Sequence, residues 1–496
     1  MDLREALQEA SFGERIAEQE VNELAEYFVE TDQWRRLYAG DVDVVYGPKG
    51  SGKSALYSLL VTKQQELFDR GILIVPAENP SGAPAFQDVA EDPPTSETEF
   101  VGLWKVYFLG LVATVLKEWG VETDDAKRVY NTLLEAGLFE AKTSLRSRLH
   151  ATRNYVRQVA RAESVEGGLL LDPGTGMPVG ITGKITLGQP QPELRAAGIV
   201  SIDELLESAN EALKTLDFSV WLILDRLDVA FVTQEELEQN ALRALFKVYL
   251  DLQALDRIAV KIFLRTDIWR SITESGFREA SHITRALTIS WERQSLLNLV
   301  MRRTLRNSEI CDYYGIDAAQ VLASVPEQES LLKLMFPEQV DLGRNPQTFD
   351  WMVSRTQDGS TKTAPRELIH LMSSLRESQL KRFEVGHDPP PAKQLFDRPA
   401  FKDALKAVSA TRLTTTLYAE YPDLKLHVEQ LEGEKTQQTP HTLGAIWEVA
   451  PEEARRVAEQ LVDVGFFERR GAKQNPAYWV PFLYRDALSM IQGEAK

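Results

Sequence analysis

The sequence has little cysteine and less basic than acidic charge. Cys311 is the single cysteine in 496 residues, so the chain cannot form an internal disulfide, and no CxxC or histidine-rich partner sequence points to a metal site. Lysine and arginine number 56 against 74 aspartates and glutamates, which gives a formal net charge of −18. A surface that binds nucleic acid needs clustered Lys and Arg to neutralise phosphates, so this charge argues against nucleic-acid binding by the whole surface. A local basic patch is still compatible with it.

Long apolar runs are also scarce. No stretch approaches the length of a membrane span, and the first six residues form a polar helical pattern without an apolar secretory core. A hydrophobic content of 43% with 26% charged residues is typical of a globular protein. We therefore expect a cytoplasmic protein without a membrane partner.

The length predicts roughly three structural units. Composition shifts and proline-rich stretches suggest the boundaries. The predicted organisation is N-terminal helices at 1–38, an ATPase core at 39–291, a helical lid at 292–385, a proline-rich linker at 386–399 and a winged-helix domain at 400–496.

A hydrophobic strand at 44–46 continues into Gly47-Pro48-Lys49-Gly50-Ser51-Gly52-Lys53-Ser54, followed by Ala55 and an apolar helix. This is the phosphate-binding pattern Gly-x-x-x-x-Gly-Lys-Ser. Its glycines let successive backbone N–H groups close around a polyphosphate at the positive end of the helix dipole. Lys53 is predicted to reach the β and γ phosphates, and the Ser54 hydroxyl to bind Mg²⁺. The sequence therefore predicts ATP and Mg²⁺ as cofactors.

Strand and helix patterns alternate after this loop, which implies a parallel sheet. The predicted fold class is α/β, a P-loop NTPase sheet flanked by helices, followed by the lid and the winged helix. Short apolar runs separated by glycines predict an inserted β-hairpin near 165–190.

An apolar strand at 218–224 ends in Asp225, where an acid at the carboxyl end of a central strand can hold Mg²⁺ through water. Asp228 follows three positions later. It is the candidate carboxylate that orients and deprotonates the attacking water, the alternative being a helix cap with a conformational role. Lys53, Asp225 and Asp228 are thus the predicted catalytic residues, and Ser54 and Asp225 the predicted metal ligands.

Another strand, at 259–265, ends in Thr266 and Asp267, either of which can sense the γ phosphate at the carboxyl edge of the sheet. Four arginines near it are candidates for a finger acting on a neighbouring subunit's ATP, and the sequence does not choose among them: Arg265, Arg270, Arg278 and Arg285. In the lid, Thr363 and Pro365 open a helix that presents Arg366 at its amino end, where it can close over phosphates.

The last hundred residues read as helix, turn, helix and β-ribbon, a winged-helix pattern. The second helix carries mixed charge, while Arg469, Arg470 and Lys473 on the ribbon are better phosphate candidates. Packing against a partner protein and contact with DNA both remain open for this domain.

With these motifs, the chain resembles the additional-strand P-loop ATPases, the group that holds the AAA+, origin-recognition-initiator, STAND and KAP families. Residues 46–56 together with Leu224-Asp225-Arg226-Leu227-Asp228 are similar to those of bacterial ATPases found in anti-phage gene neighbourhoods. The resemblance implies Mg²⁺ on Ser54 and Asp225, a sensor 1 role for Asp267 and a sensor 2 role for Arg366. Arg226 departs from AAA+ enzymes, which usually carry the catalytic Glu there, whereas STAND and KAP members tend to have an acid where Asp228 stands.

These features predict a Mg²⁺-dependent ATPase whose nucleotide state drives homo-oligomer assembly or signals to a partner protein in bacterial defence. The alternatives are an initiator-like ATPase that binds DNA through its winged helix and a nucleotide switch with slow turnover.

Overall fold

The computed structural model describes residues 2–14, 20, 23–77, 97–139, 151–157, 159, 185–190, 192–196, 198–227, 235–472 and 474–495. The chain divides into two compact units. The sheet unit comprises Asp32–Gly47 and Lys53–Thr288, and the C-terminal unit comprises Met1–Thr31, Pro48–Gly52 and Ile289–Lys496. The predicted N-terminal region 1–38 is therefore shared between the units, and the loop at 47–54 passes through both.

The sheet unit is built on a five-stranded sheet in the order β2-β5-β6-β1-β7. Every neighbouring pair runs parallel, with Gly47 beside Arg265 and Leu224 beside Ile262 in the register. This confirms the predicted α/β fold class with a parallel sheet. The strands are β1 (Val44–Gly47), β2 (Ile72–Pro76), β5 (Ser219–Leu224), β6 (Ile258–Arg265) and β7 (Ala286–Thr288).

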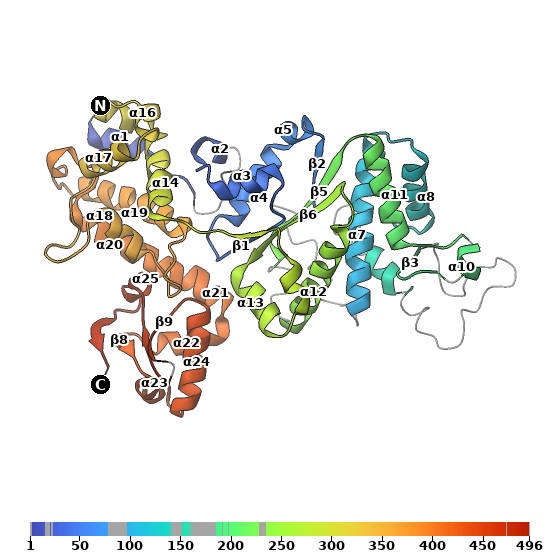
Figure 1. Ribbon diagram of the computed structural model, residues 1–496. Helices are drawn as coiled ribbons and strands as arrows, with labels where there is room; N and C mark the ends of the chain where they lie inside the picture. Colours follow the sequence, from blue (N-terminus) through green and yellow to red (C-terminus); the bar gives the residue numbers. More distant parts are fainter. Residues whose placement is uncertain are drawn as a thin grey trace. The chain divides into compact units, whose positions relative to one another are not determined.

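Helices cover both faces of this sheet, as its almost wholly apolar central strands require. Figure 1 shows α3 and α4 on one side and α12 and α13 on the other. β1 and most of β5 are buried between them. The helices of this unit are α3 (Asp32–Ala39), α4 (Lys53–Thr62), α5 (Gln64–Phe68), α7 (Glu97–Glu118), α8 (Asp124–Glu135), α10 (Pro192–Ala196), α11 (Ile202–Thr215), α12 (Glu235–Leu252), α13 (Thr266–Glu274) and the 3₁₀ turn η3 (Arg278–His282).

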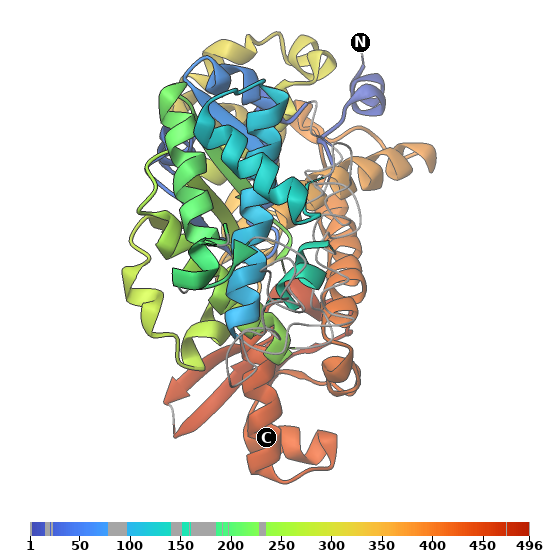
Figure 2. The same ribbon diagram turned by 90° about the vertical axis from the view of Figure 1, so that its right-hand side faces the viewer.

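Helix α7 corrects the expectation that no apolar stretch reaches the length of a membrane span. It is the one helix of the described chain that is long and apolar enough to cross a bilayer, with a mean hydropathy of 1.6 over its best window. However, 83% of that window is buried inside the protein. α7 packs side by side with α8 and α11 (Figures 1 and 2), so its apolar surface fills the core of the sheet unit.

The hairpin predicted near 165–190 lies mostly outside the described residues. Its described end is β3 (Ile185–Thr186), which pairs in parallel with β4 (Val200–Ser201). The pairing that the structure shows for this end is therefore parallel, with a strand that begins at Val200.

The C-terminal unit has one continuous hydrophobic core, which runs from Leu3 through the lid helices to Leu488. The predicted linker takes part in it, because Leu395 and Phe396 are fully buried. The helices are α1 (Leu3–Glu9), α2 (Leu24–Tyr27), α14 (Arg293–Leu305), α15 (Ser308–Tyr314), α16 (Ala318–Leu322), α17 (Val325–Met335), α18 (Thr348–Arg355), α19 (Pro365–Glu384), α20 (Arg398–Arg412), α21 (Tyr418–Glu420), α22 (Lys425–Glu429), α23 (Pro440–Trp447), α24 (Pro451–Asp463) and α25 (Phe482–Arg485), with short turns η4 (Pro391–Lys393), η5 (Leu413–Leu417) and η6 (Pro422–Leu424).

A four-stranded sheet in the order β11-β8-β10-β9 ends this unit. β9 (Glu468–Ala472) and β10 (Asn475–Trp479) form an antiparallel ribbon, preceded by α23 and α24. β8 (Lys435–Gln438) pairs with β10 and with β11 (Ile491–Glu494). The helix, turn, helix and ribbon expected from the sequence are therefore present.

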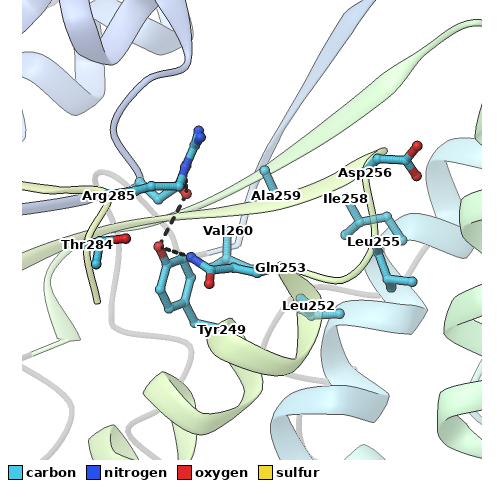
Figure 3. A pocket seen from close by; sticks show the side chains of 11 residues that line it. Tyr249, Leu252, Gln253, Leu255, Asp256, Ile258, Ala259, Val260, Thr284 and Arg285 are labelled. Carbon is cyan, nitrogen blue, oxygen red and sulfur yellow. Dashed lines mark hydrogen bonds and ion pairs between the residues drawn. The ribbon is translucent and has the colours of Figure 1, made fainter. Parts of the chain in front are cut away.

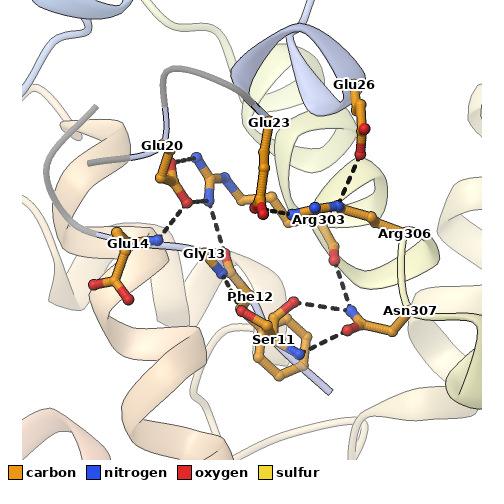
Figure 4. A network of polar contacts seen from close by, with 10 residues as sticks. All are labelled: Ser11, Phe12, Gly13, Glu14, Glu20, Glu23, Glu26, Arg303, Arg306 and Asn307. Carbon is orange, nitrogen blue, oxygen red and sulfur yellow. Dashed lines mark hydrogen bonds and ion pairs between the residues drawn. The ribbon is translucent and has the colours of Figure 1, made fainter. Parts of the chain in front are cut away.

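Polar contacts attach the N-terminal segment to the end of α14 (Figure 4). The Arg303 guanidinium donates to the Glu20 carboxylate at 2.9 Å and to the Phe12 carbonyl at 2.8 Å, and both charged side chains are buried. The Asn307 amide both donates to and accepts from the backbone of Ser11. These contacts hold Ser11, Phe12 and Glu20 at the end of α14.

Candidate nucleotide-binding site

The glycines of the loop after β1 adopt conformations that other residues disfavour. Gly50 has φ 78° and Gly52 has φ 101°, both in the left-handed region. A Cβ atom at Gly50 would lie 3.1 Å from Cβ of Arg366 and 3.3 Å from Cβ of Ala364. Because Gly50 has no side chain, the loop approaches the start of α19 this closely without displacing these atoms.

Polar groups converge on the same loop. Lys53 opens α4, and its Nζ donates to the carbonyl of Gly47 at 2.8 Å, which holds the amine beside the end of β1. Ser51 is buried, and its Oγ has no hydrogen-bond partner in the described part of the protein. Two left-handed glycines, a helix amino end and an orphaned buried hydroxyl are the features expected of a polyphosphate cradle. The residues present thus fit the triphosphate of ATP.

Asp225 follows β5 directly and is 5% exposed. Because β5, β6 and β1 are neighbours and parallel, Asp225, Thr266 and Gly47 leave the sheet at the same edge. The next residue, Arg226, has φ 57°, a left-handed conformation that costs roughly 1–2 kcal/mol for a residue with a side chain. The chain thus turns sharply after the predicted Mg²⁺ ligand, as strained functional segments do.

Asp228, the predicted general base, lies outside the described residues. Within the described residues, no group of three His, Cys, Asp or Glu side chains could hold a metal ion. One carboxylate and one hydroxyl, those of Asp225 and Ser54, suit Mg²⁺ in a phosphate site, since Mg²⁺ keeps several water ligands and binds the phosphates themselves.

Two candidate sensor residues, Thr266 and Asp267, follow β6, and their side chains differ in their hydrogen bonding. Arg265 clamps the Asp267 carboxylate with two hydrogen bonds of 3.1 and 2.6 Å. Burial by itself would raise the pKa of Asp267, but the hydrogen bond and charge of Arg265 outweigh it and hold this pKa below its usual value. Thr266 Oγ1 is buried without a hydrogen-bond partner in the described structure. Thr266 therefore has the hydroxyl available for a phosphate contact.

Two of the four finger candidates are engaged within their own chain. Arg265 binds Asp267, as above. Arg285 donates to Asp43 at 2.6 Å at the opposite, amino end of the sheet, where Arg285, Tyr249 and Gln253 line a pocket (Figure 3). There Asp43 also accepts from the buried amine of Lys261 at 2.7 Å, beside this pocket of about 380 Å³. Arg270 and Arg278 are exposed.

Within the C-terminal unit, residues that the sequence did not single out contact the loop segment 48–52. Trp291 Nε1 donates to the carbonyl of Ser51 at 2.8 Å. Lys49 forms an ion pair with Glu420 of α21. Trp291 also packs on a small apolar cluster formed by Val29, Leu299 and Ile369. No local motif marks Trp291 or Glu420, because only folding brings these positions, hundreds of residues away, to the loop.

A buried network lies next to Arg366 at the start of α19. Its neighbour Glu367 accepts from Arg412 at 3.0 Å, and Arg412 also contacts Asp358 and Tyr484. Glu367 and Arg412 are both nearly inaccessible to solvent. This network fixes the helix end that presents Arg366 against Gly50.

The fold and the loop define the class of the molecule as an α/β protein with a parallel sheet and a Gly-x-x-x-x-Gly-Lys-Ser loop after its strand β1. No protein-family model and no curated protein matches the chain. A solved structure of the ORC2 protein of Aeropyrum pernix, in ADPNP–ADP complexes, is similar at 12% identity and a TM-score of 0.36, over 94% of this chain and 92% of that one. A likeness of this size carries no argument about what the present chain binds.

Proposed function

We propose that the chain is a Mg²⁺-dependent ATPase. The observation that carries the proposal is the loop 47–54 at the carboxyl end of β1, with left-handed Gly50 and Gly52 and with the Lys53 amine on the Gly47 carbonyl. Nucleotide phosphates are the ligands that this arrangement of backbone donors and lysine suits.

The residues divide the chemistry between them. The loop amides and Lys53 bind the phosphates and offset charge that develops on them, which is the main catalytic contribution in phosphoryl transfer. Ser54 and Asp225 would hold Mg²⁺, which supplies further charge neutralisation when bound. Asp228 orients and deprotonates the attacking water. Thr266 or Asp267 detects the γ phosphate, and Arg366 contributes a positive charge from α19.

Phosphate release from ATP tests the proposal. The wild type is expected to hydrolyse ATP, Lys53→Ala to lose ATP binding, and Asp228→Asn to retain binding while hydrolysis falls by about 10²-fold or more. If the wild type, with any partner, releases phosphate no faster than Lys53→Ala, the chain is not an ATPase. Binding with no release would instead favour the slow-turnover switch, in which Asp228 has a conformational role.

We further propose that the nucleotide state drives assembly of a cytoplasmic homo-oligomer or signals to a partner protein, and that the setting is bacterial anti-phage defence. Arg270 and Arg278 are exposed, as a finger that reaches a neighbouring subunit must be. The sequence resemblance supports the defence setting.

The second candidate function is a DNA-binding ATPase that uses the helices and ribbon of residues 440–479 as a winged helix. The structure gives this mixed support, because Arg469 pairs with Glu459 and Arg470 with Glu468. Lys473 lies outside the described residues. Binding of the full chain to duplex DNA with a clear salt dependence would favour this function over packing against a protein, and absence of binding at low salt would exclude it.

A further inference from the structure

Strand β2 is an edge of the five-stranded sheet, because β5 is its one neighbour in the described part of the chain (Figure 1). The Gly71 carbonyl and the Ala77 N–H, which flank β2, both bond to β5. Backbone groups of successive residues point to alternate sides of a strand, so Ile72 and Ile74 direct their N–H and C=O groups away from β5. Pro76, which has no N–H, falls on the same outward side, where a sheet tolerates proline. The outer side of β2 therefore offers donors and acceptors at positions 72 and 74 to a further strand.

A groove of about 490 Å³ follows this strand, lined by residues of α5, by the whole of β2 and by the carboxyl-terminal part of α7 with Trp119 after it. We name it the β2 groove. The Trp119 ring is 54% exposed and stacks on Phe68 of α5, with 4.7 Å between the ring centres. A smaller apolar pocket of about 90 Å³ adjoins the groove and shares Leu73, Val115 and Trp119 with it. Exposed tryptophan beside an apolar pocket is the kind of group that contributes most to binding energy at protein interfaces.

We propose that the β2 groove binds an extended segment of a partner protein, which adds to the sheet as a strand beside β2. Such a segment supplies backbone donors and acceptors for Ile72 and Ile74, and its side chains point in turn toward α5 and toward α7. Phe68 on the α5 side and Val115 and Trp119 on the α7 side suit apolar, β-branched side chains. The site does not include the loop 47–54, and the proposal does not rest on the ATPase.

Charge indicates which segment fits the groove. Glu118 is the one charged residue among the described residues that line it, and its side chain is exposed. The whole chain carries a formal net charge of −18. A segment with a lysine or arginine near the groove is therefore attracted, and an acidic segment is repelled. A second copy of the chain would bring its own Glu118 and the same net charge, so charge favours a separate, basic partner over a second copy.

The test is fluorescence anisotropy with the full chain carrying Lys53→Ala, without nucleotide, so that a failure of the proposed ATPase does not affect the result. The probe is a labelled synthetic peptide in which valine alternates with threonine between two terminal lysines, and saturable micromolar binding is expected. A second peptide has the same side chains but an N-methyl group on every internal backbone nitrogen, which removes its donors, and it is expected to bind at least about tenfold more weakly. Hydrogen-exchange mass spectrometry should show slower exchange within β2 when the first peptide binds.

Variants of the chain locate the binding. Trp119→Ala is expected to weaken binding of the first peptide by about tenfold or more. Leu134→Ala is the matched control, since Leu134 is a 60% exposed apolar residue of α8 outside the groove, and it should change affinity less than about twofold. Glu118→Gln is expected to weaken binding by about twofold to fivefold, whereas Glu207→Gln, at an exposed acid of α11, should not.

Four outcomes overturn the proposal. The first is no saturable binding of the lysine-ended peptide up to about 1 mM. The second is equal binding of the N-methylated peptide, which would show contact through side chains alone. The third is unchanged binding by Trp119→Ala with the thermal transition of its parent, or an equal loss in Leu134→Ala. The fourth is a dimer of the full chain that Trp119→Ala abolishes, which would assign the groove to a second copy.

Discussion

At the scale of single residues, Gly50 shows how closely the phosphate loop approaches α19. Its left-handed φ disfavours any residue with a side chain, and a methyl group 3.1 Å from Cβ of Arg366 would require its neighbours to shift by a few tenths of an ångström. The sequence motif requires glycine at 47 and 52 and leaves position 50 open. Glycine at position 50 is therefore favoured both by this contact and by the left-handed backbone conformation.

Gly50→Ala is expected to weaken ATP binding by about tenfold or more, because strain of roughly 1–2 kcal/mol and a displaced Arg366 both act on the loop. Equilibrium titration with an ATP analogue measures it. Gly276→Ala is the control, since Gly276 also has a left-handed φ, of 88°, but open space around its Cβ position. Equal affinities for the wild type and Gly50→Ala would show that the approach to α19 is not needed for binding.

The ion pair between Asp267 and Arg265 predicts that the folded protein loses stability at acidic pH. The folded-state pKa of Asp267 is lowered, so its contribution is fully present above the ordinary aspartate pKa of about 3.9. That contribution is lost as the pH falls below about 4 and through the lowered pKa. Asp267→Asn should therefore lose stability at pH 7 and show a smaller decrease between pH 5 and 3 in urea unfolding, whereas Asp388→Asn at an exposed position should not. An unchanged pH dependence in Asp267→Asn would contradict the pairing.

At the scale of elements, the N-terminal segment and α14 are joined through one buried and one exposed set of ion pairs (Figure 4). Nothing local in the sequence predicts that Glu20 pairs with Arg303. The sequence predicts helices in this region, but their anchoring depends on partners that only the fold brings near.

Arg303→Met is expected to lower the free energy of unfolding by about 3–5 kcal/mol, because it leaves the buried Glu20 charge and the Phe12 carbonyl without their donor. Urea unfolding followed by circular dichroism measures the loss. Arg306→Met, which removes the exposed pairs with Glu23 and Glu26, should cost less than about 1 kcal/mol. Equal losses in the two variants would show that burial does not distinguish these pairs.

The ion pair between Lys49 and Glu420 connects the loop to α21 in the C-terminal unit. Because a carboxylate competes with phosphate for the lysine, Glu420→Gln is expected to tighten ATP binding by a factor of about 3 to 10, equivalent to roughly 1 kcal/mol. Glu432→Gln, an exposed acid of the same region, should leave the affinity unchanged. Weaker binding by Glu420→Gln would instead show that the pair holds Lys49 in place for the phosphates.

At the scale of the whole molecule, the proposed ATPase predicts assembly that depends on nucleotide. Light scattering after gel filtration is expected to show a larger particle with Mg²⁺ and a slowly hydrolysed ATP analogue than without them. Lys53→Ala should abolish the increase, while Lys63→Ala, an exposed lysine paired with Glu66 near the end of α4, should not. If the particle size of the wild type does not depend on nucleotide, nucleotide binding does not drive assembly.

The sequence by itself determined the parallel sheet, the loop motif at 47–54, the acid after β5 and the order of helix, turn, helix and ribbon near the end of the chain. It could do so because apolar periodicity, turn residues and the loop motif are local properties of the chain. Only the tertiary structure decided that Trp291, Arg366 and Glu420 contact the loop and that α7 is a core helix. Those outcomes depend on packing between residues far apart in the chain, which no local pattern records.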